Sequence, residues 1–131
     1  MAPGEFAYCD GGGRLMKYLL ILNDPAYGTE RSYNGFRLAR SLASQEGNDV
    51  RVFLMGDAVT CAIKGQTTPN GYYNLEKMVR STAAKRAEIG CCGGCLEARG
   101  ITAALLAEGA RPSSLDELTG WTVWADKVIT F

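Results

Sequence analysis

Histidine is absent from the 131 residues of this chain. Without an imidazole, neither a Ser-His nor a Cys-His catalytic pair can form, and histidine ligation of a metal ion is excluded. Any acid–base chemistry therefore has to come from Asp, Glu, Lys, Tyr or Cys side chains.

The chain also lacks an excess of either charge and lacks a long apolar run. It carries 14 basic and 14 acidic residues with no basic run, so we expect no nucleic-acid partner. No apolar stretch approaches the roughly 20 residues that a membrane-spanning helix needs, so we expect no membrane association.

The five cysteines do not form the spaced pattern of a secreted disulfide framework. Their number is odd, and three of them lie between positions 91 and 95. Disulfide-rich secreted domains space their cysteines out, so this usage favours a reducing compartment. We therefore expect a cytoplasmic protein.

The length fits one domain preceded by a short extension. Residues 1–15 contain glycine and proline but no apolar period, which is typical of a flexible N-terminal segment. The patterned region begins at Met16, and we expect one domain over residues 16–131. Cys9 falls in the extension, so we assign it no role.

From residue 16 onward, strand-like and helix-like patterns alternate five times. The apolar runs at 18–22 and 50–55 are typical of strands that are covered on both faces. Shorter strands are expected at 88–91, 110–112 and 127–131, and helices at 58–64, 75–83, 96–99 and 103–107, after a cap at Thr29 and after a Ser114–Glu117 capping box. This alternation predicts an α/β fold, with a parallel sheet and helices on both faces.

In open parallel sheets, ligands bind beyond the carboxyl ends of the strands. The first three expected strands are followed there by Asp24, Asp57 and Cys92. Each aspartate has an alternative interpretation as a turn former or a helix cap. The candidate ligand-binding residues are Asp24, Tyr27, Asp57, Gly93 and Gly94.

The cysteine cluster at 91–95 is the strongest candidate for chemistry. A strand that runs through a glycine turn into a helix would place Cys92 at the helix start, where backbone N–H groups and the helix dipole favour a reactive thiolate. Cys91 would end a buried strand, so we expect Cys91 to be structural and Cys92 to be accessible. The alternative is that these cysteines simply fill the core as small hydrophobic residues.

Residues 92–101, Cys-Gly-Gly-Cys-Leu-Glu-Ala-Arg-Gly-Ile, resemble the cysteine signature of the DsrE/DsrF-like family. Segments 24–30, 55–59, 65–69, 121–122 and 125–128 are similar to its YchN-like branch, and the resemblance extends over residues 16–131. It implies a three-layer α/β/α sandwich with a five-stranded parallel sheet. It also implies a homo-oligomer, a trimer or a hexamer, and no cofactor is expected.

In the sulfur-relay members of that family, one cysteine accepts sulfane sulfur as a persulfide and passes it on. In TusD-like members this cysteine stands seven residues before the arginine of an Arg-Gly pair, which is the position of Cys92 relative to Arg99. The resemblance therefore implies a persulfide carrier that works with a sulfur-donor or sulfur-acceptor protein. Cys95 is a second thiol where TusD-like members have apolar residues, and it allows a dithiol–disulfide step.

Two other functions remain open at this stage. The first is a thiol–disulfide redox protein using Cys92 and Cys95, although a thioredoxin-like C-x-x-C usually follows the first strand of a mixed sheet. The second is a small-ligand or metal-binding module, for which Cys61 and Cys91 would be further ligands. Zinc sites normally use two separated pairs of ligands, and adjacent strand residues point to opposite faces, so we expect no metal.

The last third of the chain predicts self-association. Leu118, Trp121 and Ala125 share the core face of the last expected helix, whereas Trp124 lies near its edge and Val123 away from it. A monomer would leave at least one large apolar group in water, and interfaces favour buried tryptophan. Light scattering should therefore give a mass above the 14.1 kDa of one chain, and Trp124→Ala should weaken the assembly. A mass near 14.1 kDa would contradict the assembly, and an unchanged mass of the variant at low concentration would place the interface elsewhere.

Overall fold

The computed structural model describes residues 16–131, so the extension expected at 1–15 and its Cys9 lie outside the described residues. The strands are β1 (Met16–Leu22), β2 (Asn48–Leu54), β3 (Glu88–Cys92), β4 (Ala110–Ser113) and β5 (Lys127–Thr130). The α-helices are α1 (Arg31–Ala43), α2 (Leu75–Ala84), α3 (Gly93–Ala98) and α4 (Leu115–Trp124). The 3₁₀ helices are η1 (Gly56–Ala62) and η2 (Ala103–Leu105).

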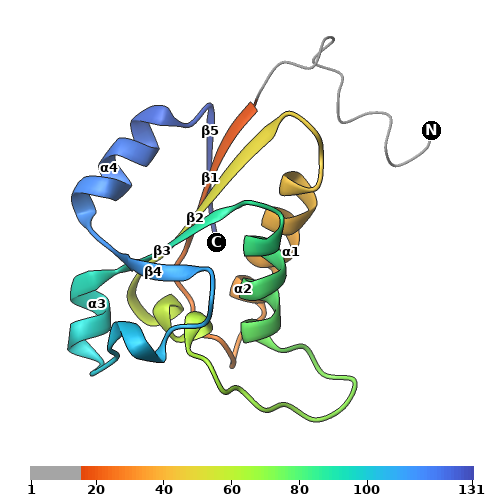
Figure 1. The fold of residues 1–131 in the computed structure, drawn as a ribbon, viewed down its shortest axis with the longest axis vertical. Helices are drawn as coiled ribbons and strands as arrows, with labels where there is room; N and C mark the ends of the chain where they lie inside the picture. The colour runs from red at the N-terminus through yellow and green to blue at the C-terminus, as the bar shows by residue number, and fades with distance from the viewer. Residues whose placement is uncertain (1–15) are drawn as a thin grey trace.

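The strands form one sheet in the order β4-β3-β2-β1-β5, and every neighbouring pair is parallel. The predicted apolar runs lie mainly in β1 and β2, and both strands have a neighbour on each side, which confirms their expected interior position. Figure 1 shows α1 and α2 against one face of the sheet and α4 against the other. The predicted α/β fold with helices on both faces of a five-stranded parallel sheet is therefore confirmed.

The larger part of the core lies between the sheet and the layer of α1, α2 and η1. Leu20 and Leu22 of β1 point to this side, and Val52 and Leu54 of β2 lie beside them. The fully buried residues of this cluster include Leu20, Leu22, Phe36, Val52, Leu54, Val59, Leu75 and Val79. This apolar layer fixes the sheet against α1 and α2.

The opposite face has a smaller core beneath α4. Leu19 and Phe53 from the sheet meet Leu118 and Trp121 from the helix, and the Phe53 and Trp121 rings pack edge to face at 6.2 Å. Ala125 packs against this cluster as expected. Because one helix covers several strands here, this face buries fewer side chains than the other.

Trp124 and Val123, which lie outside the core face of α4, differ in their exposure. Trp124 is half-buried, and the Arg51 guanidinium lies 3.8 Å from the centre of its ring. Val123 is 83% exposed. The expected wet apolar group is therefore Val123, whereas Trp124 is covered in part by a cation–π contact.

Several helix boundaries differ from the prediction. Thr29 does not cap α1, because its hydroxyl donates to the Asp24 carboxylate at 2.8 Å and Glu30 occupies the N-cap position without a side-chain bond. The helix expected at 58–64 is η1, and it ends early because Ile63 forms an isolated β-bridge with Leu106. The same bridge limits the helix expected at 103–107 to η2.

The predicted capping box of α4 is half confirmed. The Ser114 hydroxyl accepts the Glu117 N–H at 3.1 Å, as the motif requires. The Glu117 carboxylate does not return to Ser114, because it accepts two hydrogen bonds from the Arg111 guanidinium at 2.7 and 2.9 Å. A charge-assisted pair of this kind is stronger than a bond from a neutral N–H.

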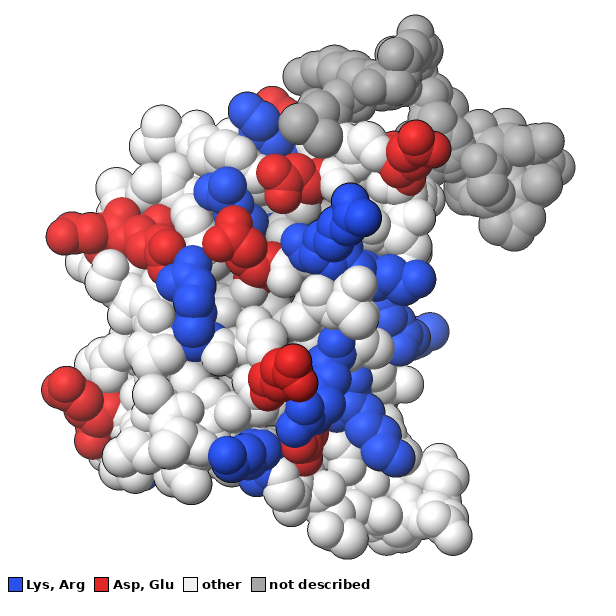
Figure 2. Space-filling model, viewed as in Figure 1, with Lys and Arg blue, Asp and Glu red and all other residues white. Residues whose placement is uncertain are grey.

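Figure 2 shows acidic and basic side chains interspersed over one side of the molecule, with Lys and Arg gathering over α1 and α2. A shallow depression in this region is lined by Arg37, Arg40 and Lys85. The balanced composition therefore does not mean an even distribution of charge over the surface.

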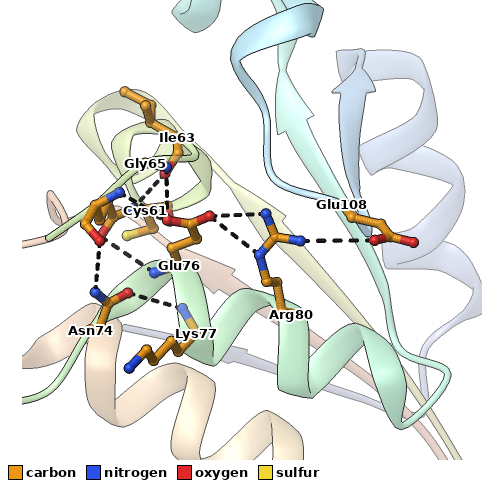
Figure 3. A network of polar contacts seen from close by, with 9 residues as sticks. Cys61, Ile63, Gly65, Asn74, Glu76, Lys77, Arg80 and Glu108 are labelled. Atoms are coloured by element: carbon orange, nitrogen blue, oxygen red, sulfur yellow. Dashed lines mark hydrogen bonds and ion pairs between the residues drawn. The ribbon is translucent and has the colours of Figure 1, made fainter.

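A network around Glu76 ties the long loop after η1 to the start of α2 (Figure 3). The Glu76 carboxylate accepts the N–H groups of Gly65 and Gln66 at 2.8 and 2.9 Å and a hydrogen bond from Arg80 at 2.9 Å. The Asn74 side chain caps α2 by accepting the Lys77 N–H at 3.1 Å. The loop is therefore held by charge-assisted bonds.

We predict that Glu76→Gln lowers the free energy of unfolding at pH 7 by about 1 kcal/mol, because the amide weakens these bonds. The bond from Arg80, with the two backbone donors, holds the pKa of Glu76 below its usual range. A lowered folded-state pKa stabilises the fold above the unfolded value of about 4.3, and this stabilisation is lost as the pH falls through the folded value. In urea titrations, wild type and variant should differ at pH 7 and converge as the pH falls below the lowered folded-state value of Glu76.

Glu108→Gln is the matched control, because Glu108 lies 3.8 Å from the same Arg80 but is 92% exposed. It should change stability little. Equal effects of the two substitutions would contradict the role given to Glu76.

Candidate functional site

The carboxyl ends of β1, β2 and β3 meet at one edge of the sheet. Leu22 pairs with Leu54, and Leu54 pairs with Cys91, so the segments that follow these strands emerge side by side. The segment after β2 brings Gly56 and Asp57 to this edge, the last residue of β3 is Cys92, and the segment after β3 brings Cys95. The structure therefore confirms that the thiols lie at this edge of the sheet.

Close packing determines the turn from β3 into α3. Cys92 ends β3 and is the N-cap residue of α3. A Cβ atom on Gly93 would lie 2.9 Å from the Ser113 carbonyl oxygen, so only glycine fits there without a shift of the backbone. A Cβ atom on Gly94 would meet nothing within 4 Å. The helix therefore begins at Gly93, three residues before the expected 96–99 segment.

The alternation of side chains along β3 separates the adjacent thiols. Cys91 is fully buried in the larger core, and burial raises the pKa of its thiol to about 12. Cys92 is half-buried and also touches the smaller core under α4. Cys61 of η1 is fully buried as well, and burial raises its pKa to about 12. Cys91 is therefore a structural residue, as predicted.

Cys92 and Cys95 form a pair in which each sulfur accepts a backbone hydrogen bond. The Cys95 N–H donates to Cys92 Sγ at 3.3 Å, and the Gly56 N–H donates to Cys95 Sγ at 3.1 Å. Both side chains are half-buried, so the pair is shielded from bulk water on one side.

The expectation that Cys92 ionises easily is wrong for this arrangement. Burial, followed by the side-chain bond with Cys95, raises the pKa of the Cys92 thiol above its usual value. The bonds from the Cys95 and Gly94 N–H groups act in the opposite direction but do not outweigh burial. A helix of 6 residues also contributes little dipole at its N-cap.

Arg99 links Asp57 to the pair of Cys92 and Cys95. Arg99 donates to Asp57 Oδ1 through Nε at 3.1 Å and through Nη2 at 2.7 Å. Its Nη1 donates to the Cys95 carbonyl oxygen at 3.0 Å. The signal available beforehand was the spacing of four between Cys95 and Arg99, which places both on one side of a helical turn.

Asp24 and Tyr27 organise neighbouring loops instead. The Asp24 carboxylate accepts from Thr29, and its carbonyl oxygen accepts from Ser32 at 2.6 Å, so it acts as a turn former. The Tyr27 hydroxyl donates to Gln66 at 2.6 Å and accepts the N–H of Leu75 at 3.1 Å. Within residues 16–131, no hydrogen bond joins either residue to the thiol pair.

The cysteines of the described region are all free, and no three of its His, Cys, Asp or Glu side chains are grouped so that they could hold a metal ion. Among the helices of the same region, none is both long enough and apolar enough to cross a membrane.

A parallel sheet with a half-buried cysteine pair at its carboxyl edge defines an α/β protein with a thiol site. Residues 16–131 match the model of the DsrE/DsrF-like family, and the chain belongs to this family. It is 40% identical over 118 residues to Protein YchN of Escherichia coli strain K12, covering 89% of this chain and 100% of that protein. It is 33% identical over 116 residues to an uncharacterized protein of Methanocaldococcus jannaschii, covering 88% and 100%.

Solved structures agree with this assignment. The crystal structure of the ychN protein from E. coli matches with a TM-score of 0.84 at 39% identity and covers 89% of this chain and 100% of that one. A protein of unknown function from Methanobacterium thermoautotrophicum matches with a TM-score of 0.71 at 15% identity, over 88% and 99% of the chains. The second likeness shows the shared fold alone.

The two glycines of the turn should respond differently to alanine. Gly93→Ala forces the backbone away from the Ser113 carbonyl and should destabilise the fold by about 1–3 kcal/mol. Gly94→Ala has open space and should stabilise α3 by up to about 1 kcal/mol. Chemical denaturation of both variants measures this difference. Equal stabilities would contradict the close approach that we assign to Gly93.

Proposed function

We propose that the protein is a persulfide carrier in which Cys92 accepts sulfane sulfur and passes it to an acceptor thiol. The observation that carries the proposal is the environment of Cys92 Sγ, which is half-buried at the carboxyl edge of the sheet and accepts the Cys95 N–H at 3.3 Å. A backbone donor of this kind stabilises negative charge on sulfur. Membership of the DsrE/DsrF-like family supports the same function.

The loading step balances without a cofactor. Cys92 Sγ attacks the outer sulfur of a donor persulfide, the donor's S–S bond breaks, and the donor leaves as a thiolate. Cys92 then carries one extra sulfur. In the transfer step an acceptor thiolate attacks that outer sulfur, and the Cys92 thiolate leaves with its electron pair, so the carrier returns to its starting state.

Thiol–disulfide exchange is the second candidate, and the bond from the Cys95 N–H to Cys92 Sγ, which holds the two cysteines side by side, favours it. In this reaction Cys95 Sγ attacks Cys92 Sγ in a mixed disulfide and releases the bound thiol. The product is a Cys92–Cys95 disulfide, and the partner is reduced by two electrons.

We also propose that the protein self-associates through the side that carries α4 and β5. Leu115 is 71% exposed and Val128 is 43% exposed on these elements, and Val123 lies in the open on the same helix. Burial of such side chains stabilises an interface. The proposed interface is the face of the sheet that a single helix covers.

Intact mass spectrometry after incubation with glutathione persulfide tests the carrier. Wild type and Cys95→Ala should gain about 32 Da, the mass of one sulfur atom, whereas Cys92→Ala should not. Cys61→Ala is the matched control for loss of a thiol, because Cys61 is buried, and it should load like wild type.

A loss of about 2 Da in wild type, without an intermediate gain, would instead support the dithiol–disulfide reaction. Loading of Cys92→Ala equal to that of wild type would contradict the assignment of Cys92.

A further inference from the structure

The side of the molecule over which Lys and Arg gather carries a depression with no Asp or Glu among the described residues that line it (Figure 2). Its volume is about 530 Å³, which is within the roughly 300–1,000 Å³ of small-molecule sites. Its polar lining comes from α1, from the C-cap residue of α1 and from that of α2, and consists of Asn34, Arg37, Arg40, Ser41, Ser44 and Lys85. Each of these side chains contains a hydrogen-bond donor group.

The depression lies at the edge of the sheet opposite the thiol pair. Near the end of α1, the Leu42 carbonyl oxygen accepts a hydrogen bond at 3.0 Å from Asn48, the first residue of β2. Cys92 is instead the last residue of the parallel strand β3. A ligand bound in the depression would therefore occupy a site separate from Cys92 and Cys95.

The cations of this lining have no carboxylate partner. α1 contains Arg31, Arg37 and Arg40 but no acidic residue. Arg31 lies 3.8 Å from the Asp24 carboxylate. Among the ion pairs within residues 16–131, none includes Arg37, Arg40 or Lys85. Acidic side chains therefore leave these three charges unneutralised.

Both arginines of the lining are held in place by neutral groups. Arg40 Nη1 donates to Ser81 Oγ at 3.3 Å and to Met78 Sδ at 3.8 Å, and both partners belong to α2. Arg37 Nη1 donates to Asn34 Oδ1 at 3.1 Å. Arg40 is half-buried, and partial burial of a charge without a counter-charge is unfavourable. An anion beside Arg40 would therefore be stabilised.

The ends of the two helices neutralise only part of the charge. Arg40 lies in the last turn of α1, and Lys85 is the C-cap of α2. Each helix end carries about −0.5 charge, so the two ends offset about one of the three positive charges. Glu46 and Asp49 line an adjoining depression, which shares Lys85 and also contains Arg86. The remaining charge of about +2 matches that of a phosphate monoester, about −1.5 to −2 at pH 7.

We propose that the depression binds the phosphate group of a small phosphorylated molecule. Arg37 and Arg40 bind the phosphate oxygens, because the guanidinium fork matches the geometry of phosphate. Lys85 adds a point charge, and the Ser41 hydroxyl and the Asn34 amide supply further donors. A nucleic acid fits the protein less well, because the chain has no net positive charge.

Isothermal titration calorimetry at pH 7 and about 0.15 M ionic strength tests the site with two probes, pyrophosphate and ADP. Pyrophosphate should bind as one molecule per chain with a Kd below about 1 mM. ADP should bind at least as tightly, because the volume of about 530 Å³ holds more than the phosphate groups.

Substitutions of the lining should weaken the binding of both probes. Arg40→Gln should raise the Kd at least about tenfold, because it removes charge-assisted bonds from a half-buried group. Arg37→Gln should act in the same direction, and because Arg37 is exposed, this variant tests the site even if Arg40→Gln is unstable. Lys85→Gln should have a smaller effect, because its charge is shared with the adjoining depression.

Arg80→Gln is the matched control. Arg80 lies on α2 in the same layer of the fold, but its charge is paired with Glu76 at 2.9 Å. This variant should bind both probes like wild type. Near-ultraviolet circular dichroism that matches wild type shows that each variant is folded.

Four results would overturn the proposal. The first is absence of binding of either probe to wild type, and the second is an affinity of Arg40→Gln and Arg37→Gln equal to that of Arg80→Gln. Binding of pyrophosphate without binding of ADP would exclude an organic phosphate as the ligand. Tighter binding of a single-stranded RNA oligonucleotide than of ADP would show a nucleic-acid surface in place of a small-molecule site.

Discussion

The close approach of α3 to the end of β4 is the constraint on which the thiol site depends. With the Ser113 carbonyl oxygen 2.9 Å from where a Gly93 side chain would begin, the chain has to turn here without a side chain. The turn ends β3 at Cys92 and starts the helix at the next residue. Cys95 is thereby placed on the first turn of α3, where its sulfur reaches the Gly56 N–H.

Burial raises the pKa of these cysteine thiols and hydrogen bonds to the sulfur lower it, and burial has the larger effect at Cys61, Cys91 and Cys92. Cys61 and Cys91 have pKa values raised to about 12, so they are inert thiols at neutral pH. The pKa of the Cys92 thiol is also raised, first by burial, while the Cys95 and Gly94 N–H groups act to lower it. All four cysteines of the described region have the same intrinsic chemistry. The position that the turn gives to Cys92 and Cys95 therefore distinguishes this pair from the buried Cys61 and Cys91.

Local patterns predicted the elements of this fold well. The apolar runs of β1 and β2 identified two interior strands, because a strand covered on both faces has no polar alternation. The position of Cys91 at the end of a buried strand also predicts its burial, which the structure confirms. Boundaries were less accurate, since the bridge between Ile63 and Leu106 ends two helices early and joins positions far apart in sequence.

The candidate site could be predicted only in part. Its location at the carboxyl edge followed from the topology, but Gly56 and Arg99 act through bonds that span 39 and 42 positions, which no local pattern contains. The direction of the Cys92 pKa was wrong for the same reason, because burial and the contact with Cys95 are tertiary features. The loop positions of Asp24 and Tyr27 suggest ligand binding, but in the structure their hydrogen bonds go to residues that shape the neighbouring loops.

Alkylation of the native, reduced protein by iodoacetamide, located by tandem mass spectrometry, tests the central claim that the turn divides the adjacent thiols. The account predicts that Cys92 is modified near pH 8, whereas Cys91 reacts only after unfolding. Faster modification of Cys91 than of Cys92 would show that the strand is shifted by one residue and would contradict the account.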